Sequence, residues 1–196
     1  MSAFPKAALA VLGAMLLQSV AAEAKATTLD QVFSDQFYAS TDLSRVPLWR
    51  DLLSRMSDDR GDWREETDAL TGASPEQQLN QVNALFNRPS YHTDQASWGV
   101  QDYWETPSQL LAFGGDCEDS AAAKYFALRR LGFSASALRI TLVRDVRAGQ
   151  FHAVLLVALR GRVMLLDNRG DVVGDANVLE NYVPILAMNE AMWWRV

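Results

Sequence analysis

The feature that most constrains the fold of this chain is a change in hydrophobic periodicity at Gly132. Before this glycine, apolar residues recur at helical spacing in three segments, residues 43–58, 74–88 and 116–131. After it, residues 137–146 alternate apolar and other side chains, and residues 151–169 are two apolar runs broken at residues 160–162. Helices followed by strands, rather than strict alternation, predict an α+β fold with an antiparallel sheet.

The ends of the expected helices carry recognisable signals. Ser74 is a suitable N-cap, and Pro75 suits the first helical position because a missing N–H costs nothing there. Gly132 follows the 116–131 segment where a C-terminal cap belongs. Residues 91–109 lack clean periodicity, so we expect an ordered connection there.

The break between the two apolar runs decides which side chains share a face of the expected hairpin. If Arg160 and Gly161 form a two-residue turn, Asp167 lies opposite Val154 and diagonal to His152 on the same face. A three-residue loop would place His152 and Asp167 on opposite faces. Arg160 is poorly suited to a left-handed turn position, so the pattern leaves the turn type open.

The amino-terminal residues 1–24 have the pattern of a secretory signal peptide. Lys6 precedes an uncharged apolar run over residues 7–20, and Ala22-Glu23-Ala24 fits a small-x-small cleavage site. A membrane anchor is the competing interpretation, but the run is short for a span and no stop-transfer charges follow it. Residues 25–196 are then expected to form a single domain, and no later segment is apolar enough to cross a membrane.

Charge and cysteine content narrow the classes of function. The formal net charge of −6 argues against nucleic acid or an anionic membrane surface as the main partner. Cys117 is the only cysteine of the chain, so no internal disulfide can form. The remaining interpretations of this thiol are an intermolecular bridge, an inert core residue or a reactive nucleophile.

Cys117 stands among acids at the expected start of a helix. A helix amino terminus favours a thiolate, but Asp116, Glu118 and Asp119 should raise the thiol pKa above its reference of about 8.5. Ordinary helix capping explains one or two of these acids. A hard cation such as calcium, which takes six to eight oxygen ligands, would offset all three charges, although the spacing is not that of an EF-hand.

A nucleophilic cysteine needs a base, and the base needs an orienting group. His152 is the polar exception in an apolar strand, and it is either a core histidine bonded to a backbone carbonyl or the base. Asp167 either begins a turn or orients that imidazole. His92 lies in the irregular stretch before the cysteine, and we expect it not to be catalytic.

Three blocks together, GGDCEDSAAAKYFALRRLGF, QFHAVLLV and VMLLDNR, resemble the bacterial transglutaminase-like cysteine proteinases, in particular their periplasmic members from biofilm-forming bacteria. The resemblance extends over nearly all of residues 75–170, and the G-D-C-E-D block is its most specific part. It implies a papain-like, transglutaminase-like fold with Cys117 as nucleophile, His152 as general base and Asp167 as orienting residue.

The same resemblance implies a cofactor, a substrate and a partner. Such enzymes depend on calcium held by acids that flank the cysteine, which fall here on Asp116 and Glu118 and can extend to Asp119. They cut a large surface adhesin near its amino-terminal anchor, at a pair of alanines, and so release it and disperse the biofilm. An inner-membrane receptor for cyclic di-GMP restrains them from the periplasmic side.

Three hypotheses for the function therefore stand. The first is a calcium-dependent endopeptidase, and the second is a transglutaminase or amidase, which shares the thioester intermediate and differs only in the acceptor. The third is a non-catalytic module that binds calcium or a receptor, against which an intact set of Cys117, His152 and Asp167 speaks. Peptide cleavage, amine incorporation and their response to a chelator separate the three.

Overall fold

The computed structural model describes residues 28–33, 37–170, 174–175, 179 and 181–195. Its α-helices are α1 (Leu29–Val32), α2 (Pro47–Arg55), α3 (Trp63–Asp68), α4 (Pro75–Phe86), α5 (Asp94–Ser97), α6 (Pro107–Phe113) and α7 (Cys117–Arg130), and its 3₁₀ helices are η1 (Leu43–Arg45) and η2 (Ala135–Ala137). Its strands are β1 (Tyr38–Ser40), β2 (Leu138–Asp145), β3 (Gln150–Leu159), β4 (Arg162–Leu166), β5 (Gly174–Asp175), β6 (Tyr182–Met188) and β7 (Trp193–Arg195). The signal peptide expected over residues 1–24 lies outside the described residues.

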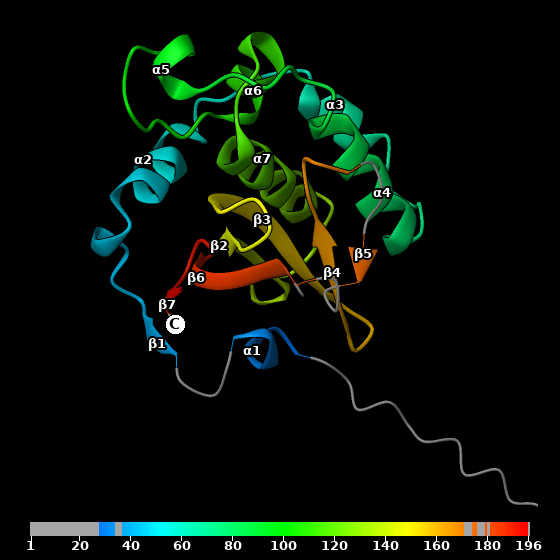
Figure 1. The fold of residues 1–196 in the computed structure, drawn as a ribbon. Coiled ribbons are helices and arrows are strands. Elements are labelled where there is room, and N and C mark those ends of the chain that lie inside the picture. Colours follow the sequence, from blue (N-terminus) through cyan, green and yellow to red (C-terminus); the bar gives the residue numbers. More distant parts are fainter. Residues whose placement is uncertain (1–27, 34–36, 171–173, 176–178, 180, 196) are drawn as a thin grey trace, which may run out of the picture.

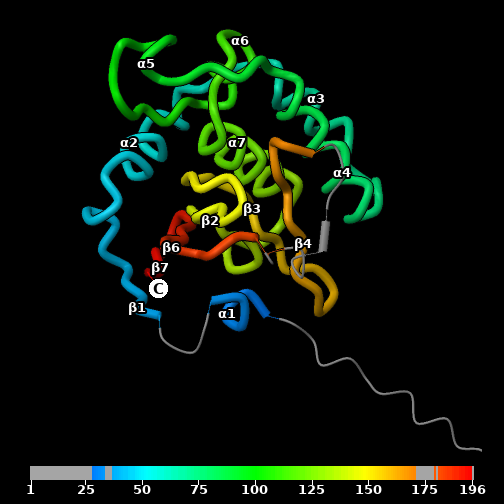
Figure 2. The backbone as a smooth tube through the Cα atoms, in the orientation of Figure 1, coloured from blue at the N-terminus to red at the C-terminus, as the bar shows by residue number. Residues whose placement is uncertain are grey.

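The strands form one antiparallel sheet in the order β1-β7-β6-β2-β3-β4-β5. The predicted α+β class with an antiparallel sheet is confirmed. The early strand β1 was not predicted, because three residues are too few to show a period. Its pairing with β7 joins Tyr38 to Arg195 and places β1 beside the carboxyl end of the chain at one edge of the sheet (Figure 2).

Helix α7 lies against one face of the sheet, and α1 lies on the other side (Figure 1). Alternation along residues 153–158 of β3 serves both faces, since the odd-numbered side chains belong to the core cluster of α7 and the even-numbered ones to that of α1. The first core cluster includes Ala121, Tyr125, Leu128, Ile140, Leu155 and Val157. The second includes Leu29, Phe33, Val143, Val154, Leu156 and Trp194. A long helix that is buried along its length is therefore fixed to the central strands, and its amino terminus is fixed with it.

The helix signals read from the sequence are found in the structure. The Ser74 hydroxyl accepts the N–H of Gln77 at 3.3 Å, and Pro75 is the first residue of α4. Helix α7 ends before Gly132, whose φ of +94° lets Phe133 N–H reach the Leu128 carbonyl at 3.0 Å. The segment predicted over residues 43–58 is helical but divided into η1 and α2.

Helices α2 to α6 form an arch around α7, on the sides that do not face the sheet (Figure 1). The connection expected over residues 91–109 holds α5 and the start of α6. Indole hydrogen bonds tie this helical side to the last strands, since Trp49 Nε1 donates to the Asn189 carbonyl and Trp193 Nε1 to the Asp42 carbonyl, both at 2.9 Å. Among the described residues, no helix has the length and apolar character needed to span a membrane.

Candidate active site

Cys117 is the first residue of α7, and Asp116 is its N-cap. Asp119 completes a capping box, because its Oδ2 accepts the N–H of Asp116 at 2.9 Å. The thiol therefore lies at the positive end of a 14-residue helix, as the sequence predicted.

Two glycines before Asp116 let another segment pass close to this helix start. Gly115 donates its N–H to the Ser90 carbonyl at 3.2 Å and accepts the N–H of His92 at 3.0 Å. Gly114 has a φ of +78°, and a Cβ built on it would lie 2.5 Å from the Ser90 carbonyl oxygen. The glycines thus hold Tyr91 beside the loop that carries Cys117.

The β3–β4 hairpin brings the imidazole and the carboxylate together. Leu159 pairs with Arg162, so Arg160 and Gly161 form a two-residue turn, with φ values of 50° and 75°. His152 Nε2 lies 2.8 Å from Asp167 Oδ1, which is the geometry expected from the two-residue turn. The alternative with a three-residue loop is excluded.

Asp167 is held by more than the imidazole. Its Oδ1 also accepts the N–H of Arg169 at 2.9 Å, and its Oδ2 accepts the Tyr182 hydroxyl at 2.7 Å. Burial opposes ionisation, but the bonds from His152, Arg169 and Tyr182 outweigh it and lower the Asp167 pKa to about 2. An ionised carboxylate can only accept, so Nε2 of His152 carries the proton and Nδ1 is the other ring nitrogen.

Cys117 and His152 line the same cleft. Two adjoining cavities, of about 480 and 580 Å³, share the walls Tyr91, Asp116, Cys117, Phe151 and His152. One wall comes from the start of α7 and the segment beside it, and the other comes from the start of β3. Tyr91 and Phe151 are 66% and 77% exposed, more than any other large apolar side chain of the described residues.

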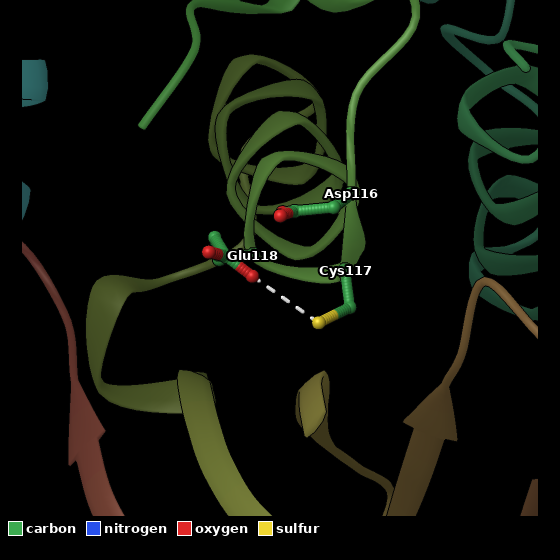
Figure 3. A group of neighbouring side chains, drawn as sticks. All are labelled: Asp116, Cys117 and Glu118. Atoms are coloured by element: carbon green, nitrogen blue, oxygen red, sulfur yellow. Dashed lines mark hydrogen bonds between the residues drawn. The ribbon is translucent and has the colours of Figure 1, made fainter. Parts of the chain in front are cut away.

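The thiol donates its hydrogen bond to Glu118 rather than to His152. Cys117 Sγ lies 3.2 Å from Glu118 Oε2, and the Asp116 side chain lies next to both at the start of α7 (Figure 3). Burial first, and then the charges of Glu118 and Asp116, raise the pKa of Cys117. A hydrogen bond with the backbone of Ala153 lowers the pKa of Cys117, but the other causes outweigh it. The electrostatic penalty expected from the sequence is therefore present in the folded chain.

The three acids of the helix start join two others to form a carboxylate cluster, defined here as Asp94, Asp102, Asp116, Glu118 and Asp119. Carboxylate oxygens of Asp94, Asp116 and Asp119 lie within 4.8 Å of one another, as do those of Asp94, Asp102 and Glu118. Asp94 and Asp102 were missed because acids in an irregular segment show no period that would reveal where they converge.

Burial is the main reason why the pKa values of all five acids are raised, with mutual repulsion as a further cause for most of them. The pKa of Asp116 rises to about 9 and that of Asp119 to about 8. Asp119 is fully buried and accepts the N–H of Glu105 at 2.7 Å as well as that of Asp116. It thus acts as a cap within the cluster, whereas Asp116 Oδ1 is buried without a hydrogen-bond partner in the described part of the chain.

His92 is exposed and lines neither cavity of the cleft. Its ring lies over Gly114, where an added Cβ would meet Cδ2 at 2.8 Å. His92 therefore lies against the loop before α7, and its lack of a catalytic role stays a prediction.

A cysteine at a helix start that shares a cleft with a histidine–aspartate pair, on this α+β fold, defines a transglutaminase-like cysteine peptidase. Residues 54–195 match the model of the bacterial transglutaminase-like cysteine proteinases (BTLCP), and the chain belongs to this family. No curated protein sequence matches the chain.

Within this class, the chain is similar to LapG of Legionella pneumophila. The calcium-bound LapG structure is 28% identical, with a TM-score of 0.61 over 75% of this chain and 87% of that one. An EGTA-treated form is 28% identical, with a TM-score of 0.60 over 75% of this chain and 84% of that one. A third LapG structure is 29% identical, with a TM-score of 0.59 over 74% of this chain and 86% of that one.

Proposed function

We propose that this protein is a calcium-dependent endopeptidase with Cys117 as nucleophile, His152 as general base and Asp167 as orienting residue. The observation that carries the proposal is the 2.8 Å contact between His152 Nε2 and Asp167 Oδ1 in a hairpin whose histidine shares a cleft with the only cysteine. Membership of a cysteine proteinase family supports the same roles.

In this mechanism Nδ1 of His152 takes the proton of the Cys117 thiol. The thiolate attacks the substrate carbonyl carbon, and the imidazolium returns the proton to the leaving amine as the C–N bond breaks. Water, deprotonated by the same nitrogen, then hydrolyses the thioester and frees the thiol. The backbone N–H of Cys117, at the first position of α7, is suited to stabilise the oxyanion of both steps.

The carboxylate cluster fits a calcium ion. All its donors are oxygens, burial and then mutual repulsion raise their pKa values, and Asp116 Oδ1 is buried without a partner among the described residues. Asp116 and Glu118 would hold the ion, with Asp94, Asp102 and Asp119 within reach of the same cluster. A bound ion supplies positive charge beside Cys117 and so favours its thiolate.

The cellular role that we propose follows the family resemblance and the similarity to LapG. The protein is secreted to the periplasm after removal of residues 1–24, and it cuts the amino-terminal region of a large surface adhesin at a dialanine site. This cleavage releases the adhesin and controls biofilm attachment. The partner that restrains it is the periplasmic domain of an inner-membrane cyclic di-GMP receptor.

The experiment that tests the proposal measures cleavage of a dialanine-containing peptide by the wild type and by Cys117→Ala, with calcium and with EGTA. We expect turnover only in the wild type with calcium. Activity retained by Cys117→Ala would contradict the assignment of the nucleophile. Incorporation of a fluorescent amine instead of hydrolysis would favour a transglutaminase, and calcium binding without either reaction would favour a non-catalytic module.

A second measurement follows the thiol directly. Because Glu118 and Asp116 oppose the thiolate, alkylation of Cys117 by iodoacetamide at neutral pH should accelerate about tenfold or more when calcium is added. Magnesium should act weakly, because it demands tight octahedral geometry and retains its waters. An alkylation rate that does not depend on calcium, with full activity in EGTA, would refute the metal site.

A further inference from the structure

The second oxygen of the Asp167 carboxylate has a partner of its own. Oδ1 faces His152 Nε2 at 2.8 Å, and Oδ2 accepts the Tyr182 hydroxyl at 2.7 Å. The Tyr182 ring also lies beside the imidazole, with ring centroids 5.6 Å apart. A carboxylate bonded through both oxygens cannot rotate about its Cβ–Cγ bond without losing a hydrogen bond.

Strand register explains how Tyr182 reaches this point. Asp145 on β2 pairs with Tyr182 on β6, and Val143, two residues earlier on β2, pairs with His152 on β3. Paired residues share a face, and so do residues two apart on one strand. Tyr182 and His152 therefore project from the same face of the sheet, where the end of the β3–β4 hairpin also presents Asp167.

Arg169 and Asp145, which lie behind Tyr182, help to keep its hydroxyl a hydrogen-bond donor to Asp167. Arg169 lies near the hydroxyl and bonds Asp145 Oδ2 at 2.6 Å, while Asp145 Oδ1 accepts the N–H groups of Arg147 and Ala148, each at 2.9 Å. Burial and the adjacent Asp167 carboxylate raise the pKa of Tyr182 to about 12, although Arg169 opposes this. The hydroxyl is thus protonated at neutral pH.

We propose that Tyr182 is a positioning residue of the active site, which fixes the plane of the Asp167 carboxylate and through it the orientation of the His152 ring. This inference rests on the proposed roles of the three catalytic residues. Tyr182 does not line the cleft, so it should affect turnover and not substrate binding.

Tyr182→Phe is the test, because it keeps the ring beside His152 and removes only the hydroxyl. We expect kcat per titrated thiol to fall about tenfold with KM unchanged. Tyr125→Phe is the matched control, since the buried Tyr125 hydroxyl accepts the N–H of Glu190 at 3.1 Å and lies outside the cleft. This control should lower the thermal midpoint and leave kcat unchanged. A Tyr182→Phe enzyme with the kcat of the wild type would overturn the inference.

A double-mutant cycle identifies the route of the effect. In an Asp167→Ala background, Tyr182→Phe should change kcat by less than about twofold, because its hydroxyl no longer has a carboxylate to hold. A tenfold loss in both backgrounds would show that Tyr182 acts by another route and would overturn the inference. Wild-type protein without any turnover would instead refute the proposed function.

The contact can also be tested without turnover. The Nε2 proton of His152, observed by NMR in protein with ¹⁵N-labelled histidine, should shift and exchange faster with water in Tyr182→Phe than in the wild type. Loosening of the carboxylate is the expected cause. An Nε2 resonance with the same position and exchange rate in both proteins would overturn the inference, whatever the activity.

Discussion

At the scale of single residues, the site is a place where buried charges have few partners. The thiol of Cys117 donates to a carboxylate, and the five acids of the carboxylate cluster keep raised pKa values. Asp167 is the exception, because three hydrogen bonds keep it ionised. The helix that carries Cys117 buries one further charge, that of Lys124, whose Nζ has no hydrogen-bond partner among the described residues.

Replacement of Lys124 by methionine should stabilise the protein in a manner that depends on pH. Burial lowers the Lys124 pKa to about 7, although Asp167 opposes this, so the unfolded chain binds more protons than the folded one between pH 7 and the ordinary lysine pKa of 10.5. The cost of the lysine is therefore largest at and below pH 7 and disappears as the pH rises through that window. Lys124→Met should raise the free energy of unfolding by roughly 2–4 kcal/mol at pH 7.

Urea unfolding of both proteins at pH 7 and pH 10 is the measurement. The difference between variant and wild type should shrink at the higher pH. An equal gain at both values would mean that Lys124→Met acts through packing and not through titration of the amine.

At the scale of elements, the loop before α7 depends on close backbone approach. Gly114 and Gly149 both have left-handed φ values, of 78° and 69°. Only Gly114 faces a neighbour, since nothing lies within 4 Å of a Cβ on Gly149. The two positions share a positive φ, and Gly114 alone adds an extended ψ of 173° and a close backbone neighbour.

Gly114→Ala should destabilise the protein more than Gly149→Ala. Both substitutions cost roughly 1–2 kcal/mol for the positive φ, and Gly114→Ala should cost about 1–3 kcal/mol more because its ψ of 173° lies in a region that essentially only glycine adopts and because its Cβ would meet the Ser90 carbonyl. The shift of this segment should also lower activity by displacing Tyr91 and Cys117. Thermal midpoints and kcat of the two variants test this, and equal losses in both would show that the loop can move at little cost.

At the scale of the whole molecule, the site exists only where two layers meet. The helical side supplies Cys117, the carboxylate cluster and Tyr91, and the sheet supplies Phe151, His152, Asp167 and Tyr182. The exposed rings of Tyr91, from the helical side, and Phe151, from the sheet, are apolar surfaces that an extended substrate can cover.

Tyr91→Ala and Phe151→Ala should each raise KM about fivefold for a peptide substrate and change kcat little, because they remove apolar contact area beside the reacting groups. Phe113→Ala is the control, since this ring is 60% exposed but lines neither cavity. Steady-state kinetics with one peptide compare the three variants. An increase in KM for Phe113→Ala as large as for the other two would assign the effect to general loss of surface rather than to the cleft.

Features that are local along the chain could be predicted from the amino-acid sequence alone. Periodicity and end signals defined the central helix with Cys117 at its start and Gly132 after its end, because caps and helical spacing act within a few residues. The hairpin parity limited His152 and Asp167 to two arrangements, and the family resemblance assigned roles to both. The acids beside the cysteine indicated that a thiolate at this position needs a compensating positive charge.

The convergence of distant side chains, in contrast, was decided by the tertiary fold. In the folded chain the β3–β4 turn has two residues, and Asp94 and Asp102 lie beside the acids of the helix start. Tyr182 donates to Asp167 because β6 pairs with β2. None of these contacts has a sequence period, since each depends on the register between strands or on the path of an irregular loop. Such choices are set by the packing of the complete core, where the free energies of many weak contacts add.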